Sequence, residues 1–115
     1  MKYQGSCHCG KIAFEAEGEL KQVIACNCSM CMRRGGLLWF VPATQFTLKT
    51  PRVDLSTYLF NKHVIEHHFC GTCGIAPFGE GRDPKGNAMV AVNARCVEGF
   101  DPGAVQIQQY DGRSH

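Results

Sequence analysis

Seven of the eight cysteines in this chain lie in three short groups, and thiolates are among the ligands that zinc prefers. The groups are Cys7 with Cys9, Cys26 with Cys28 and Cys31, and Cys70 with Cys73. In an extended strand, residues i and i+2 share a face. The sulfurs of Cys7 and Cys9 can therefore reach one ion, as can those of Cys26 and Cys28. This grouping predicts a zinc protein.

A count of ligands divides the cysteines between two sites. A structural zinc has four closed tetrahedral ligands, and the pairs Cys7/Cys9 and Cys70/Cys73 supply four thiolates from distant parts of the chain. The middle group supplies three thiolates by itself, and no fourth cysteine is near it in the sequence. Three protein ligands with an open position are typical of a catalytic zinc. We therefore expect one structural and one catalytic zinc.

Other uses of these cysteines stay open. Disulfide frameworks belong mainly to secreted chains, and residues 1–6 contain no apolar signal-peptide core. Cys70 and Cys73 could form a redox pair, although Gly74 follows them as in a metal-binding turn. One zinc alone could also bind, because spacing does not fix occupancy. Cys96 is most simply a core or turn residue, but as a fourth ligand it would close the middle site.

An open zinc held by Cys26, Cys28 and Cys31 would activate a thiol. A free thiol is only a few per cent ionised at neutral pH, whereas a zinc-bound one is deprotonated. The thiolate would attack an aldehyde to give an S-hydroxyalkyl adduct, and the reverse reaction would release the aldehyde. Three thiolates carry more negative charge than zinc carries positive charge, so binding of an anionic thiolate at this site requires a nearby cation. Arg33 and Arg34 follow the group, and we assign this role first to Arg33.

The histidines carry a weaker signal than the cysteines. His67 and His68 are adjacent on an expected strand and so face opposite sides, and His8 lies between two ligands. We interpret all three as structural. A neutral histidine near the open zinc could, however, shuttle the hydroxyl proton of the adduct.

Length and charge limit the other function classes. A chain of 115 residues predicts a single domain, 1–115, small enough for a metal to add substantially to its stability. Its net charge is only +2 and its cations are scattered, which argues against nucleic-acid binding. No apolar stretch approaches the roughly 20 residues needed to cross a bilayer. We expect a soluble, cytoplasmic protein that does not bind membranes.

The elements that must position these cysteines are expected to be strands. Alternating or continuous apolar runs predict strands at 11–17, 21–26, 37–41, 53–60, 64–69 and 88–93. Residues 61–63 and 81–87 are expected to form turns. One helical turn is predicted at 29–34, with Ser29 as its cap. The expected fold class is all-β, mainly antiparallel.

The same motifs carry a family resemblance. The start Gly5-Ser6-Cys7-His8-Cys9-Gly10, the block from Cys26 to Cys31 followed by Arg33, the turn Phe69-Cys70-Gly71-Thr72-Cys73-Gly74, and Val92-Asn93-Ala94-Arg95-Cys96 together resemble the glutathione-dependent formaldehyde-activating enzymes, a family that also contains centromere protein V. The resemblance runs from about Gly5 to Gly99.

This resemblance implies a zinc-stapled β-tent of two packed antiparallel sheets. It implies a structural zinc on the outer cysteine pairs, a catalytic zinc on the middle three cysteines, and carbon–sulfur lyase activity on S-hydroxymethylglutathione. The small thiol glutathione, or its aldehyde adduct, is thus the expected partner. The chain is shorter than glutathione-dependent relatives, which leaves room for another thiol. A non-catalytic, zinc-stapled module that binds a protein is the alternative, since fold alone does not fix function.

Overall fold

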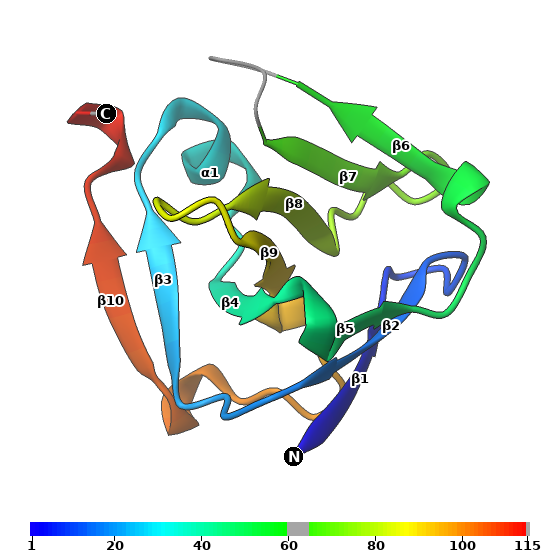
Figure 1. Ribbon diagram of the computed structural model, residues 1–115, viewed down its shortest axis with the longest axis horizontal. Coiled ribbons are helices and arrows are strands. Elements are labelled where there is room, and N and C mark those ends of the chain that lie inside the picture. The colour runs from blue at the N-terminus through cyan, green and yellow to red at the C-terminus, as the bar shows by residue number, and fades with distance from the viewer. Residues whose placement is uncertain (60–64, 115) are drawn as a thin grey trace.

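The computed structural model describes residues 1–59 and 65–114, which form two packed sheets (Figure 1). The smaller sheet has three strands in the order β1-β2-β5: β1 (Lys2–Ser6), β2 (Ala13–Glu17) and β5 (Phe46–Leu48). Both of its strand pairs are antiparallel. This sheet places the first cysteine pair, because Cys7 directly follows β1.

The larger sheet has seven strands and carries the remaining cysteine groups. Its order is β10 (Gln106–Tyr110), β3 (Gln22–Cys26), β4 (Leu38–Pro42), β9 (Ala88–Asn93), β8 (Phe78–Arg82), β7 (Glu66–Cys70) and β6 (Leu55–Tyr58). The pairing of β10 with β3 is parallel, and the other pairs between these described strands are antiparallel. The middle cysteine group begins at the end of β3, and the last pair begins at the end of β7.

Aromatic side chains join the two sheets. Phe46 of β5 lies between Phe14 of β2, at a ring-centroid distance of 5.4 Å, and Phe78 of β8, at 4.6 Å. Tyr3 of β1 meets Trp39 of β4 edge-on at 5.4 Å. These contacts bury apolar area from both sheets, which is the main favourable contribution to folding.

Helical segments are short. The α-helix α1 (Ser29–Arg34) follows β3, and five 3₁₀ turns connect or follow strands in the part of the chain that the structure describes. They are η1 (Ala43–Gln45), η2 (Arg52–Asp54), η3 (Ala94–Cys96), η4 (Pro102–Ala104) and η5 (Gly112–Ser114). Cys28, rather than the expected Ser29, caps α1, because its sulfur accepts the N–H of Cys31. No helix among the described residues is long and apolar enough to span a membrane.

The fold class predicted from the sequence is confirmed, and every predicted strand overlaps an observed one, although β4 and β7 each end one residue later than predicted. The predicted strand 53–60 begins in η2 rather than in β6. Residues 60–64 lie outside the described residues, and they include the end of this predicted strand, the predicted turn at 61–63 and the first residue of the predicted strand 64–69. The predicted turn at 81–87 was wrong at its start, because β8 continues through Arg82. The strands β1, β5, β8 and β10 were missed.

Candidate metal sites

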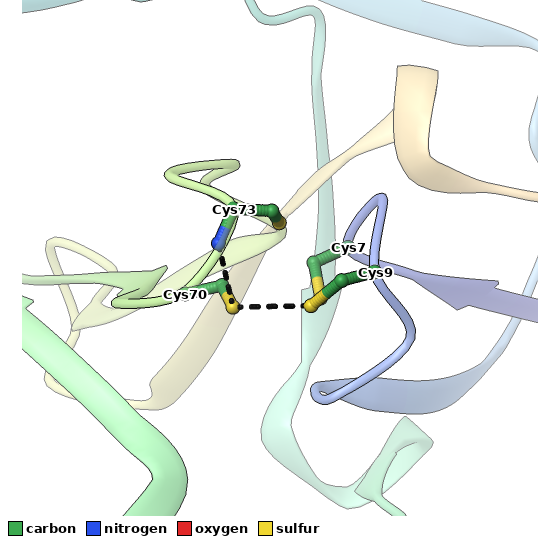
Figure 2. Close-up of side chains that lie close together, drawn as sticks. All are labelled: Cys7, Cys9, Cys70 and Cys73. Atoms are coloured by element: carbon green, nitrogen blue, oxygen red, sulfur yellow. Dashed lines mark hydrogen bonds between the residues drawn. The ribbon is translucent and has the colours of Figure 1, made fainter.

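Four cysteines from distant parts of the chain converge where the loops after β1 and β7 meet. Figure 2 shows Cys7 and Cys9 on one loop facing Cys70 and Cys73 on the other. All four sulfurs lie within 4.8 Å of one another. Cys7 is 2% exposed and Cys70 is fully buried. We refer to these residues as the four-cysteine group.

Both loops fold in a similar way. The N–H of Cys7 donates to the carbonyl of Ile12, and the N–H of Cys70 donates to that of Ile75, each at 2.9 Å. Cys7 and Cys9 therefore lie in a turn rather than in the extended strand that the sequence suggested. Backbone N–H groups also point at sulfur: Ile12 donates to Cys7 Sγ at 3.3 Å, and Cys73 to Cys70 Sγ at 3.4 Å. Such bonds favour the thiolate form that a metal requires.

The sulfur spacing in this group fits a tetrahedral zinc. The sulfurs of Cys7 and Cys9 are 3.7 Å apart, and those of Cys9 and Cys70 are 3.6 Å apart. Zinc–sulfur bonds of about 2.3 Å place neighbouring sulfurs of a tetrahedron roughly 3.8 Å apart, whereas a disulfide bond is only about 2.05 Å long. The group can therefore hold a metal ion, and its cysteines are free rather than disulfide-bonded.

The electrostatics of the group also favour a cation. Backbone N–H groups of Ile75 and Cys9 lower the pKa of Cys73 to about 6. At Cys9 the N–H of Lys11 favours the thiolate, but partial loss of water and the neighbouring sulfurs raise the pKa to about 11. Adjacent thiols resist ionising together because their negative charges repel. A divalent cation removes this conflict.

The second group is formed by residues that are close together in the sequence. Cys26 ends β3, Cys28 caps α1 and Cys31 lies within that helix, so a strand end and one helical turn bring the three together. Their sulfurs lie within 4.8 Å of one another, and each residue is partly exposed. Backbone N–H groups donate to Cys26 Sγ from Cys28 and to Cys28 Sγ from Cys31, both at 3.4 Å. We refer to these residues as the three-cysteine group.

The donor set of this group suits a metal as well. Burial, the sulfur of Cys28 and the charges of its neighbours raise the pKa of Cys31. At Cys28, burial opposes ionisation, but the N–H of Cys31 and the two neighbouring sulfurs lower the pKa. Within residues 1–59 and 65–114, no fourth cysteine, histidine or carboxylate joins the group. The described chain thus offers a metal three ligands here.

Cys96 lies nearer the four-cysteine group than the three-cysteine group. Burial raises the pKa of its thiol to about 11, and the charges of Cys7 and Cys73 act in the same direction. It belongs to neither set of converging sulfurs among the described residues. The interpretation of Cys96 as a small packed residue in η3 therefore fits better than a fourth ligand of the middle group.

The two arginines at the end of α1 differ in their surroundings. Arg33 Nη1 donates to the carbonyl of Ser29 in its own helix at 2.9 Å. Partial burial lowers the pKa of Arg34, while the negative charges of Cys31 and Tyr58 act to raise it. His67 is partly buried near this cation, and burial together with the charges of Arg34 and His68 lowers its pKa. Sequence reasoning named both arginines and put Arg33 first, whereas the electrostatic contact with Cys31 is made by Arg34.

His68 has a structural environment. It is 2% exposed, its Nδ1 lies 2.9 Å from Thr57 Oγ1, and its Nε2 lies 2.6 Å from Glu80 Oε1. Arg52 Nη2 donates to the same Glu80 oxygen at 2.6 Å. The residues Glu66, His68 and Glu80 are close enough to hold a metal ion. However, a guanidinium already neutralises Glu80, so an internal ion pair accounts for this cluster.

Comparison with known proteins agrees with this fold. A crystal structure of a Rhodobacter sphaeroides protein superimposes with a TM-score of 0.78 at 28% identity, covering 91% of this chain and 99% of that one. Residues 2–111 match the family described as glutathione-dependent formaldehyde-activating enzyme, which is nearly the whole sequence. The chain therefore belongs to the glutathione-dependent formaldehyde-activating enzyme family.

Proposed function

We propose that the protein is a zinc-dependent carbon–sulfur lyase that acts on a thiol–aldehyde adduct of the S-hydroxymethylglutathione type. Family membership supports a substrate related to glutathione. The observation that carries the proposal is the three-cysteine group, where Cys26, Cys28 and Cys31 converge and are partly exposed. Three protein ligands leave a fourth position for substrate, as in catalytic rather than structural zinc sites.

The two cysteine groups would divide the roles. The four-cysteine group, Cys7, Cys9, Cys70 and Cys73, would hold a structural zinc that ties the loop after β1 to the loop after β7. The three-cysteine group would hold the catalytic zinc. Zinc there supplies a Lewis acid that keeps an incoming sulfur ionised. A site with three protein ligands leaves a position for substrate, whereas a site closed by four ligands does not.

The reaction requires a leaving sulfur and a proton acceptor. In the cleavage direction the carbon–sulfur bond breaks with its electron pair going to sulfur. The hydroxyl oxygen becomes the carbonyl oxygen of the aldehyde, and its proton passes to a base. We assign this role to His67, because Arg34 interacts electrostatically with both His67 and Cys31. Burial and the nearby positive charges lower the pKa of His67 and so favour the neutral imidazole.

Charge balance assigns a role to the end of α1. Three thiolates and one divalent ion carry a net charge of −1, which disfavours an anionic substrate. We propose that the cations Arg33 and Arg34 offset this charge and bind the carboxylates of the adduct or the thiolate that its cleavage releases. The electrostatic contact of Arg34 with Cys31 supports Arg34 most directly. Arg33 would have to leave the carbonyl of Ser29 to contribute fully.

The test is an exchange measurement on the zinc-loaded protein. Glutathione and ¹³C-formaldehyde form the adduct reversibly, and NMR exchange spectroscopy measures how fast formaldehyde enters and leaves the adduct with and without the protein. We expect the protein to accelerate both directions and Cys31→Ser to abolish the acceleration. A protein that holds two zinc ions yet does not accelerate exchange with any small thiol would favour the zinc-stapled binding module instead.

A further inference from the structure

The chain returns to the three-cysteine group near its last described residues. Strand β10 pairs in parallel with β3, with Tyr110 opposite Cys26. The residues that follow β10 lie beside the loop between β3 and α1 (Figure 1). We call residues 110–114 the tail segment. The tail segment therefore contacts a cysteine group whose own members all lie within residues 26–31.

Asn27, which lies between two of the cysteines, holds the tail segment in place. Its N–H donates to the carbonyl of Tyr110 at 3.1 Å, and its Nδ2 donates to Asp111 Oδ1 at 2.9 Å. Its Oδ1 accepts the N–H of Arg113 at 2.8 Å. Ser114 Oγ donates to the other carboxylate oxygen of Asp111 at 2.7 Å. One residue therefore binds the tail segment on both sides of Gly112.

Gly112 is placed directly against the sulfur of Cys26. A Cβ atom added at Gly112 would lie 2.5 Å from Cys26 Sγ, 3.3 Å from Cys28 Cβ and 3.5 Å from the ring of Tyr110. Unbonded carbon and sulfur atoms normally stay more than about 3.5 Å apart. The backbone of Gly112 does not have a positive φ, so the contact with sulfur, rather than backbone strain, is what excludes a side chain.

We propose that the tail segment forms one wall of the three-cysteine metal site, in which Gly112 leaves the space that the metal-binding position of Cys26 requires and Asn27 is the positioning residue. This inference rests on the proposed metal at the three cysteines but not on lyase activity. Without metal, Cys26 can rotate its sulfur away from a side chain at position 112. With metal, the three sulfurs must converge and that movement is lost.

Two consequences follow from this arrangement. Substitution of Gly112 affects metal affinity much more than stability of the metal-free fold. By reciprocal linkage, metal bound at the three cysteines stabilises the docked tail segment. Contacts that orient metal ligands from outside the coordination sphere typically change affinity by roughly 10- to 100-fold. We expect Gly112→Ala to weaken the second metal by an amount in that range.

The experiment is a titration with Co²⁺, whose thiolate complexes absorb visible light, of full-length protein that retains the metal of the four-cysteine group. Gly112→Ala is compared with Gly103→Ala, another glycine without positive φ, whose added Cβ would meet only Asp101. We expect at least a tenfold loss of affinity for the second metal in Gly112→Ala and none in Gly103→Ala. Equal affinities of the wild type and Gly112→Ala would overturn the inference.

A polarity swap tests Asn27 separately. Asn27→Asp places a carboxylate against Asp111, so it should undock the tail segment and weaken the second metal. The double variant Asn27→Asp/Asp111→Asn has the wild-type net charge and restores a donor opposite an acceptor. It should recover most of the affinity, and hydrogen exchange of the tail segment should slow again when metal binds. Failure of the double variant to recover either property would contradict a positioning role.

The outcome separates this inference from the proposed function. If the wild type takes up no second metal, the metal site and the inference both fail. If the wild type binds it and the variants bind equally well, the tail segment is not a wall of the site, and the proposed lyase remains intact.

Discussion

The two cysteine groups use the same donor atom but differ in how the chain brings them together. The four-cysteine group joins residues 61 positions apart, Cys9 and Cys70, between loops of different sheets. The three-cysteine group is completed within one strand end and one helical turn. Metal at the first group would cross-link distant parts of the fold, whereas metal at the second would constrain a short segment. The first group is therefore suited to a structural metal and the second to the accessible metal that we propose.

The largest effect is expected from the four-cysteine group. Cys73→Ser removes one of four ligands and leaves the remaining sulfurs, including the fully buried Cys70, without a complete site. Because metal binding and folding are coupled in such sites, we expect loss of the cooperative unfolding transition and low solubility. Circular dichroism during heating measures this change.

Cys96→Ser is the matched control for that variant. Cys96 is partly buried, and burial together with the charges of Cys7 and Cys73 raises the pKa of its thiol. Its sulfur nevertheless does not belong to the four-cysteine group. It should unfold cooperatively, with a midpoint near that of the wild type. A cooperative, soluble Cys73→Ser variant would show that the two groups do not differ in the way described here.

The second prediction concerns the three-cysteine group. Cys31→Ser should keep the fold, because the metal it loses constrains only residues 26–31 and the tail segment docked beside them. It should bind one zinc ion fewer than the wild type. Formaldehyde exchange should fall to the uncatalysed rate. Zinc content and exchange NMR on the same sample check both parts. If this variant unfolded as completely as Cys73→Ser, the division into structural and accessible sites would be lost.

A smaller effect is expected when the proposed base is removed. His67→Asn should retain both metals and reduce kcat by about 100-fold, the lower end of what a positioned base contributes. The acidic limb of the pH–rate profile should disappear, because it would reflect protonation of this imidazole. An unchanged profile would assign proton transfer to another group or to water.

The smallest effect is expected from the cations at the end of α1. Arg34→Ala should raise KM for the glutathione adduct by about tenfold, which corresponds to the loss of one charge-assisted hydrogen bond. Arg33→Ala should change KM less, because its guanidinium already bonds to Ser29 O. A larger effect of Arg33→Ala would reverse this ranking and restore the assignment made from the sequence.

The sequence predicted the features that depend on local pattern. The cysteine spacing anticipated both converging groups, and the helical turn at Ser29–Arg34 was predicted with the observed bounds. Strand β9 was likewise predicted in full from its apolar sequence AMVAVN. In the structure its residues alternate between buried and partly exposed positions from Met89 onward. These elements carry their own hydrophobic or capping signals.

What the sequence missed depends on tertiary contacts. Strand β10 has the polar sequence QIQQY and every residue is exposed, so it lacks a hydrophobic pattern and is recognisable only from its pairing with β3. Strand β8 contains two glycines, which suggest a turn. The contact of Gly112 with Cys26 joins residues 86 positions apart, and no local motif marks it. The role of such a glycine can be identified only when its neighbours in the folded structure are known.

The most direct test of the difference between the two groups is the zinc content of the gently purified protein by native mass spectrometry, before and after adding zinc and then glutathione. We expect two zinc ions per chain, the second lost more readily than the first. Glutathione should bind only to the two-zinc species. A chain that never exceeds one zinc, or that binds glutathione equally well with one, would contradict an open three-cysteine metal site.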